Sequence, residues 1–473
     1  MTAGPDEKRD ETPQKKPAGA PPGRSAALAR LPFYYGWVVV AVAFVTLGVG
    51  VSVRTAFSLL FPPILDEFGW LRAETAAIFS IGFATSMLIT PFLGVAINRF
   101  GPGVVMAAGS VLVGGGLVLT TVAAGQSLIF LSLGCAVVGG AIILGYTGHA
   151  YLMPFWFVKR RGLATGLAFS GAGVGSILLF PWWQDIIREA GWREACLTMA
   201  LILFVLVLPL NLLLQRRRPE DLGLRPDGRR TAQTAPAGPA GSASQDSAAA
   251  LDTVVDREWA SRDWSLGEAM LTARFWWLGL GLFFGMYAWY AVQVHQTQYL
   301  GEIGFSPTAA AFALGLVGLF GVAGQIGMGG LSDRIGREWA WTLSTLGFAV
   351  CYLLLLMMRD DPSQALLWLM VAGQGALGYG MASIFGAILA EVFQCRRFGQ
   401  IFGAFGMLIS IGAACGPWLT GEFYDRTGNY DLAWWAGLGA CALSILGMWM
   451  GAPRKVRLVS GIAKRRGGLT DTG

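Results

Sequence analysis

Long apolar runs separated by short polar segments dominate the chain. Each run holds about 20 residues, which is enough for a helix to cross a bilayer, and none shows the strict alternation of a barrel strand. The run 38–61, for example, is broken by only five polar residues. The pattern predicts twelve membrane-spanning helices, at 36–61, 75–97, 103–123, 127–156, 162–187, 194–214, 275–300, 308–330, 339–358, 364–392, 400–424 and 431–452.

Prolines and glycines mark several of the expected helix ends. We expect Pro62-Pro63 to close the first span and Gly101-Pro102 to open the third. The fourth, fifth and tenth spans are long, which allows tilt or interruption. Bends are expected at three internal prolines, Pro154, Pro181 and Pro417.

The two halves of this pattern repeat each other at an offset of about 235 residues. Gly94, Asn98, Arg99 and Gly101 in the first half correspond to Gly329, Asp333, Arg334 and Gly336 in the second. A membrane-embedded repeat is typical of transporters whose halves rock around a site between them. We therefore predict an all-α membrane protein of two pseudo-symmetric six-helix bundles. Its expected parts are a disordered tail (1–35), a bundle (36–214), a disordered linker (215–263), a bundle (264–452) and a tail (453–473).

Composition supports the membrane interpretation. Hydrophobic residues make up 54% of the chain and charged residues only 14%, which excludes an ordinary soluble domain of this length. The 66 glycines are about twice the usual share, as expected where helices approach closely in lipid.

Lysine and arginine predict the orientation. The tails and the loops after even-numbered spans hold 29 of them, so both termini should be cytosolic. The net charge of +6 then reflects topology, and nucleic acid is not an expected partner. The bias toward Ala, Gly and Arg points to a bacterial inner membrane. The loops on the other side hold only five basic residues, Arg72, Arg188, Arg193, Arg359 and Arg426.

Several chemistries find no support in the sequence. The six cysteines are scattered, without a C-x-x-C pair or paired histidine ligands, so neither a metal site nor a disulfide is expected. The usual nucleotide-binding and hydrolase motifs are also missing. We therefore expect no enzyme and no cofactor, and transport that follows gradients.

The repeated segments resemble a motif of the major facilitator superfamily, in which Gly, an acidic residue, a basic residue and Gly follow the second and eighth spans. The resemblance covers about 36–452 and implies alternating access. A carboxylate near a helix end can pair with an arginine and with helix termini, forming a cytosolic gate that breaks when the inner side opens. We expect this gate at Asp333 and Arg334. Its first copy, Asn98 and Arg99, lacks the acid and should be weaker.

A second resemblance is narrower. The segment from Trp156 to Gly171, which enters the fifth span, resembles the fifth-helix signature of the monocarboxylate transporter family. Tyr34-Tyr35-Gly36-Trp37 resembles that family's first-helix signature, without its acidic and extra glycine residues. The resemblance implies small organic anions such as lactate or pyruvate, often moved with a proton. Related bacterial branches exchange oxalate for formate.

Arg54 is the only arginine or lysine inside a predicted span. A guanidinium within hydrocarbon costs several kcal/mol and is usually kept for a partner or a cavity. It precedes Pro62 by eight residues, roughly 12 Å along a helix from the outer end of the span. It would suit a substrate carboxylate, and the monocarboxylate transporter family carries a basic residue at a nearby position. An arginine at this depth could also snorkel to the surface, and both roles stay open.

The eighth span departs from the monocarboxylate transporter family, which carries an aspartate and an arginine there. Their places fall near Gly321 and Gln325. No acidic residue lies at mid-depth in any predicted span, so a buried carboxylate proton relay is not expected. Either His149 carries a proton, or the protein exchanges anions, or it passes a protonated or weakly charged substrate.

Histidine and tyrosine side chains complete the candidate site. His149 could bind substrate together with Tyr146 on the same helix face, or could hydrogen-bond to a neighbouring helix. Tyr287 and Tyr290 share one face of the seventh span and could orient an organic acid, although packing against lipid would explain them equally well. His295 is expected near the outer mouth.

We therefore expect a secondary transporter of a small organic anion, above all a monocarboxylate. The alternatives are a transporter of a larger aromatic or amphipathic compound, and a membrane sensor or scaffold that signals through its tails. The expected partners are the substrate and membrane lipid, and the expected state is a monomer. The expected substrate site comprises Arg54, Tyr146, His149, Tyr287, Tyr290 and Gln325.

Overall fold

The computed structural model is helical throughout the residues that it describes, apart from turns and one isolated bridge between Val254 and Arg457. It describes residues 33–150, 152–157, 161–222, 224, 254–393, 395, 397–459, 461 and 462. The predicted tail as far as residue 32, residues 225–253 of the predicted linker and residues 463–473 lie outside this set. Among the described residues, twelve helical segments are long and apolar enough to cross a membrane, which confirms the predicted twelve-span, all-α fold.

The first half contributes six of these segments, and spans 1, 4 and 6 each combine several helices. In chain order the helices are α2 (Gly36–Thr55), α3 (Phe57–Phe68), α4 (Arg72–Phe100), α5 (Pro102–Thr121), α6 (Gln126–Ile129), η1 (Phe130–Gly139), η2 (Gly140–Ile142), α7 (Tyr146–Ala150), α8 (Met153–Trp156), α9 (Arg161–Ala190), α10 (Trp192–Ile202), η3 (Leu203–Val207) and α11 (Leu208–Leu214).

The helices of the second half form the other six spans, which are preceded by two short helices. In chain order these helices are α12 (Arg257–Ser261), α13 (Leu266–Met270), α14 (Ala273–Glu302), α15 (Pro307–Ile335), α16 (Arg337–Met358), α17 (Gln364–Ala372), η6 (Gly373–Leu377), η7 (Gly378–Gly380), α18 (Met381–Val392), α19 (Phe398–Thr427) and α20 (Asp431–Gly451).

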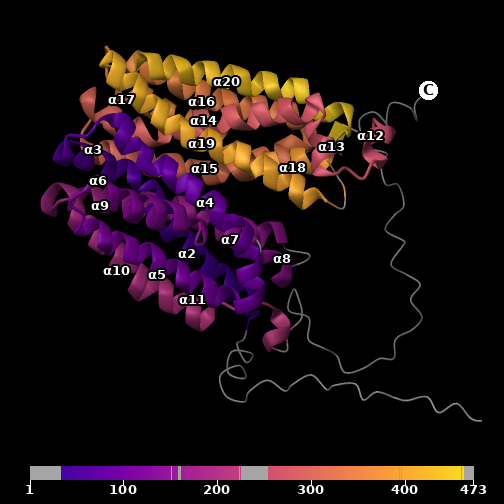
Figure 1. Cartoon of the computed structure of the whole chain (residues 1–473), viewed down its shortest axis with the longest axis horizontal. Coiled ribbons are helices and arrows are strands. Elements are labelled where there is room, and N and C mark those ends of the chain that lie inside the picture. Colours follow the sequence, from indigo (N-terminus) through magenta and orange to yellow (C-terminus); the bar gives the residue numbers. More distant parts are fainter. Residues whose placement is uncertain are drawn as a thin grey trace, which may run out of the picture.

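The helices form two bundles that lie side by side. Figure 1 shows the indigo-to-magenta helices of the first half in one bundle and the salmon-to-yellow helices of the second half in the other. We call the end where α2 begins and α11 finishes the terminal end, and the opposite end the far end. The main contacts between the bundles are those of α9 with α15 and of α4 with α19.

Small residues allow α9 and α15 to touch along their backbones. A Cβ atom on Gly173 would lie 2.7 Å from the carbonyl oxygen of Gly318, and one on Gly315 would lie 3.0 Å from that of Ser176. Neither space accepts a side chain without moving a helix. The two bundles therefore meet at mid-depth through a crossing that depends on glycine.

The prediction that Pro62-Pro63 closes span 1 is wrong, because α3 continues to a left-handed Gly69 with a φ of 61°. A proline lacks the N–H that would bond to the carbonyl four residues earlier. For Pro62 that carbonyl belongs to Ser58, and it accepts a hydrogen bond from the Thr297 hydroxyl of α14 at 2.5 Å. A side chain of the second half therefore replaces the missing donor, and the helix continues through the prolines.

The other helix breakers behave differently from one another. Gly101-Pro102 opens α5 as expected, with Gly101 at a φ of 84°. Pro181 and Pro417 lie inside α9 and α19, each of which is one continuous helix. Pro154 lies in the short helix α8, beyond a break in span 4.

Spans 4 and 10 are irregular at the same position of the repeat. In span 4 the π-helix η1 is followed by the 3-10 turn η2, and in span 10 the π-helix η6 is followed by the 3-10 turn η7. Interrupted helices at corresponding positions of two repeats mark the binding region in many transporters, and π-helices are frequent at functional sites. Tyr146 begins the helix after one interruption, and Tyr379 lies within the other.

Candidate functional site

Arg54 lies one residue before the end of α2, facing the second half. It is half-buried, and its Nε and Nη2 atoms are buried without a hydrogen-bond partner. Its Cζ atom lies 4.3 Å from the ring centroid of Phe83 on α4. Tyr290 of α14 is within electrostatic range. The guanidinium thus faces aromatic rings at mid-depth and keeps unused donors for a ligand.

Aromatic rings from both halves surround this guanidinium. The ring centroids of Phe83 and Tyr290 are 4.5 Å apart, and those of Phe79 and Tyr290 are 5.8 Å apart. Trp289 stacks beside Tyr290, and its centroid lies 4.2 Å from that of Tyr379. The rings continue from α4 across α14 to span 10, so the region combines one cation with a wide apolar lining.

Tyr379 fills the space that a side chain at position 321 would need. A Cβ atom on Gly321 would lie 2.5 Å from the Tyr379 ring, so the monocarboxylate transporter family's acidic residue would not fit there. The other departure, Gln325, lies one turn further along α15 and interacts with the Tyr146 hydroxyl of span 4. The positions of the charged pair therefore hold neutral groups that can donate and accept hydrogen bonds.

A polar link that our list of site residues lacks joins the halves next to Arg54. Gln293 of α14 places its Nε2 atom 3.4 Å from the Thr55 hydroxyl, and its Oε1 atom accepts a hydrogen bond from the Trp289 ring N–H at 3.0 Å. A glutamine in the middle of an apolar span is the signal that could have identified it.

The structure places Arg54, Tyr146, Tyr290 and Gln325 together, and the other two candidates elsewhere. Tyr287 points to Cys415 and Thr420 of α19, within the second half. His149 is fully buried, and its Nδ1 atom lies 3.0 Å from the carbonyl oxygen of Gly145, in the same span. That carbonyl only accepts, so Nδ1 carries the hydrogen and Nε2 is a buried acceptor without a partner.

The first copy of the predicted gate forms a contact within its own half that contains no ion pair. Arg217, after span 6, donates to the carbonyl oxygen of Asn98 at 2.7 Å and to its side-chain oxygen at 2.8 Å. The guanidinium of Arg99 lies 5.3 Å from the Phe100 ring. Asparagine therefore still fastens the end of α4 to the end of α11, without an ion pair.

The second copy of the gate is charged. Arg337 forms ion pairs with Asp333 at 2.7 Å and with Glu391 of span 10 at 2.8 Å. Arg334 is exposed beside the segment that follows span 12, where Gly461 approaches its backbone. The described ion pairs of this copy join spans of the same half.

The two signature segments meet at the terminal end. Tyr34 donates its hydroxyl to the Trp156 carbonyl at 2.7 Å, and Tyr35 donates its hydroxyl to the Leu214 carbonyl at 2.8 Å. The ring of Tyr34 also lies edge-on to Phe157. In this arrangement the aromatic part of both signatures fastens spans 1, 4 and 6 together, far from Arg54.

The far end holds an ionic cluster that our list of site residues also lacks. Arg72, at the start of α4, forms an ion pair with Glu302 of α14 and donates to the Tyr430 hydroxyl. Asp425 of α19 accepts hydrogen bonds from the backbone N–H groups of Arg72 and Ala73. In the sequence, Arg72 contributed only to the predicted orientation. The signal that could have identified this cluster is the presence of charged residues at the span ends of both halves.

Two further contacts close the far end. The Thr308 hydroxyl of α15 donates to Asp185 of α9 at 3.4 Å, and the Ser80 hydroxyl of α4 donates to the Ala414 carbonyl of α19 at 2.5 Å. The described hydrogen bonds between the halves thus extend from mid-depth to the far end. This structure has a closed far end.

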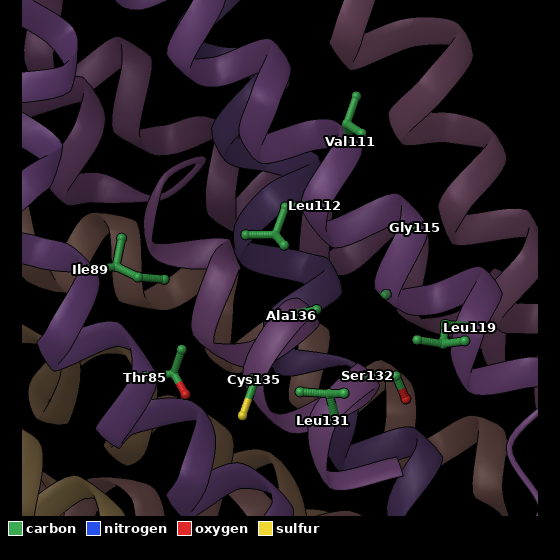
Figure 2. Close-up of a pocket in the computed structure, with 11 residues that line it drawn as sticks. Thr85, Ile89, Val111, Leu112, Gly115, Leu119, Leu131, Ser132, Cys135 and Ala136 are labelled. Atoms are coloured by element: carbon green, nitrogen blue, oxygen red, sulfur yellow. The ribbon is translucent and has the colours of Figure 1, made fainter. Parts of the chain in front are cut away.

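A separate apolar groove of about 530 Å³ lies within the first half. It runs between α4, α5 and η1, and Figure 2 shows Leu112, Gly115, Leu131 and Cys135 along it. Its lining contains no charged side chain and does not include Arg54. Within the described residues, no group of three His, Cys, Asp or Glu side chains could hold a metal ion.

Comparison with known proteins identifies the fold's family. A model of the Major Facilitator Superfamily matches residues 38–385 and 277–468. The chain belongs to the Major Facilitator Superfamily. It is similar to monocarboxylate transporter 12 of Rattus norvegicus, with 26% identity over 417 residues that cover 84% of this chain and 82% of that protein. It is also similar to monocarboxylate transporter 11 of Mus musculus, with 26% identity over 458 residues, 93% of this chain and 90% of that protein.

These matches confirm both predicted resemblances, to the Major Facilitator Superfamily and to its monocarboxylate transporter-like members. The chain is a multi-pass membrane transporter of this type. A bacterial homologue of the human lysosomal transporter Spinster, solved in an inward-facing and occupied conformation, is similar in fold. The TM-score is 0.60 at 16% identity, and the match covers 91% of this chain and 97% of that one.

Proposed function

We propose that this transporter moves a small organic anion, above all a monocarboxylate, by alternating access. The observation that carries the proposal is Arg54, a mid-depth guanidinium with two buried nitrogen atoms that have no partner. Unpaired buried donors are costly, and an anion bound there would supply the missing acceptors. A carboxylate matches the planar donor pair of an arginine.

Tyr146, Tyr290 and Gln325 complete the proposed binding site. Each is half-buried at mid-depth, and they come from span 4, α14 and α15, so a ligand among them would contact both halves. Hydroxyl and amide groups would orient the substrate, while the rings around Arg54 would hold its apolar part. Tyr287 and His149 are left out of this set, because their described contacts lie within their own halves.

The relatives support the substrate class. The two relatives described above are monocarboxylate transporters by name, and they align with most of this chain. The departures at Gly321 and Gln325 favour a second candidate, a larger aromatic or amphipathic acid, because Tyr379 extends the aromatic lining where an acidic side chain would stand. The two candidates share the carboxylate and differ in the body that it carries.

The predominance of basic residues at the terminal end supports a cytosolic position for that end, in a bacterial inner membrane. With its far end closed, the structure would then be an inward-facing state. Substrate bound at Arg54 would be carried between the two sides as the far and terminal ends open in turn.

Uptake into proteoliposomes under an imposed pH gradient tests the proposal. The panel contains labelled lactate, pyruvate, oxalate and formate beside an aromatic carboxylate such as benzoate. Arg54→Ala should reduce uptake to the background, whereas Arg54→Lys should keep part of it. Arg188→Ala is the matched control, since Arg188 is exposed and forms ion pairs only with neighbours on α9 in the described structure. Unchanged uptake by correctly inserted Arg54→Ala protein would remove Arg54 from the site.

A further inference from the structure

A hydrogen-bonded chain at the far end leads from the first half to a buried histidine in the second. Arg72 donates from Nη1 to the Tyr430 hydroxyl oxygen at 2.5 Å and from Nη2 to Glu302. Behind Tyr430 lies His295 of α14, whose side chain is fully buried. Its Nδ1 atom is 3.1 Å from the Tyr430 hydroxyl oxygen, and its Nε2 atom is 2.9 Å from the Pro417 carbonyl oxygen.

These contacts fix the direction of every hydrogen bond in the chain. A carbonyl oxygen only accepts, so Nε2 of His295 carries the hydrogen that is donated to Pro417. Nδ1 of the neutral ring then accepts from the Tyr430 hydroxyl. Burial raises the pKa of Tyr430, although the charge of Arg72 works against this, and the group remains a hydroxyl. The Tyr430 oxygen in turn accepts from Arg72.

A second proton on His295 does not fit this closed arrangement. It would convert Nδ1 into a donor, so that a histidine cation and the Arg72 cation would both point at the Tyr430 oxygen. The ring of Phe61, from α3 of the first half, lies edge-on to His295 with centroids 4.9 Å apart. Bulk water does not reach the ring to replace the lost acceptor, because the histidine is fully buried. The closed far end therefore selects the neutral ring.

Opening of the far end reverses this preference. Arg72 and Phe61 belong to the first half, whereas Tyr430, His295 and Glu302 belong to the second. Their separation frees the Tyr430 oxygen to accept from the histidine. It also leaves the carboxylates of the second half without their arginine. The described titratable or charged side chains around the histidine are Arg72 on α4, Tyr299 and Glu302 on α14, Tyr424 and Asp425 on α19, and Tyr430 between α19 and α20.

We propose that His295 is a proton-binding site linked to the opening of the far end. The open state takes up the proton, which replaces the positive charge withdrawn with Arg72, and closure expels it. Because linkage is reciprocal, acid favours the open far end. This inference rests on alternating access and not on the substrate proposed for Arg54.

Hydrogen–deuterium exchange of the full-length chain in lipid nanodiscs tests the link without substrate. The backbone N–H groups of Arg72 and Ala73 are bound to Asp425 while the far end is closed, so their peptide reports opening. When the pH is lowered from about 8 to 5.5, the exchange rate of this peptide, corrected for its intrinsic pH dependence, should rise about fivefold or more. An unchanged corrected rate in the wild-type protein would overturn the proposal.

Two histidine variants locate the effect. His295→Gln keeps a donor for Pro417 and an acceptor for Tyr430 but cannot titrate in this range, so its exchange should not depend on pH. His149→Gln, which removes the other histidine of the chain, should respond like the wild type. A full pH response in His295→Gln would overturn the proposal.

A tyrosine variant serves as a second test, also in case His295→Gln does not fold. Tyr430→Phe removes the link between the histidine and Arg72 while leaving the ion pair with Glu302 in place. Its pH response should be reduced at least twofold, because the closed state no longer discriminates as strongly against the second proton. An undiminished response in this variant would equally overturn the proposal.

Discussion

Asp425 provides the most direct test of whether the far end is a gate. Its two carboxylate oxygens accept from the backbone N–H groups of Arg72 and Ala73 at 3.0 and 2.8 Å. These groups begin α4, so a carboxylate of one half caps a helix of the other and faces the positive end of its dipole. Gly421, one turn earlier on α19, allows the approach, since a Cβ there would lie 2.5 Å from the Ala73 nitrogen.

Asp425→Ala removes both hydrogen bonds from the closed state only. A hydrogen bond to a charged group contributes about 1.5–3 kcal/mol. Since Asp425 is half-buried, we count the pair at the strength of one such bond. The equilibrium should then shift toward the open far end by about tenfold to a hundredfold. Asp425→Asn keeps one acceptor and should give a smaller shift.

The opening is measured by double electron–electron resonance, as the distance between spin labels at two exposed far-end positions, Glu189 in the first half and Asp360 in the second. The six native cysteines are replaced first, and transport is checked in that background. The control is Glu422→Ala, because Glu422 pairs with Arg426 within α19 and should leave the distances unchanged. If Asp425→Ala gives the same distance distribution as its parent, the capping contact does not hold the far end closed.

Three further substitutions test the packing that positions the site, each by thermal unfolding in detergent. Gly321→Ala should lower the free energy of unfolding by about 1–3 kcal/mol, because its Cβ would overlap the Tyr379 ring. The same substitution should cost much less when it is made in a Tyr379→Ala protein, and no loss in the wild-type background would contradict the filled space. Thr297→Val should cost about 1–3 kcal/mol by leaving a carbonyl of α3 without a donor, and a neutral result would show that water replaces it. Glu391→Ala should cost about 1–3 kcal/mol by stripping one partner from the largely buried Arg337, with Glu391→Gln milder; equal losses would contradict a role for the charge.

The sequence alone predicted the twelve spans and the repeat, because a helix that crosses lipid needs a minimum length and an apolar composition, and both can be read from the residues. It also singled out Arg54 as a candidate, since a cation in an apolar run is costly unless it has a partner, a cavity or a path to the surface. The continuation of helix α3 through Pro62 was not predictable. It depends on Thr297, which lies far away in the chain and becomes a neighbour only when the halves pack.

The partners of the site residues could not be predicted from the sequence either. Gln325 and Gly321 appear in the sequence as two lost charges, and only the packed structure shows that Tyr146 and Tyr379 meet them. The same holds for Arg72, which looked like one basic residue in a loop until Asp425 and Glu302 came to it from the other half. Pairings between repeats leave no local periodicity, so a single sequence carries no direct record of them.

The charges at the two ends differ in a way that bears on the transport cycle. At the far end the described pairs join the two halves, as in Arg72 with Glu302, and they must break when that end opens. At the terminal end the described contacts of Arg337 and Arg217 lie within one half each, as expected in the proposed inward-facing state, where that end is already open. Opening of the far end breaks an ion pair between the halves and therefore needs compensation. A proton arriving at His295 in that step would supply a positive charge on the half that has just lost one, and would keep the two states close in energy, as exchange between them requires.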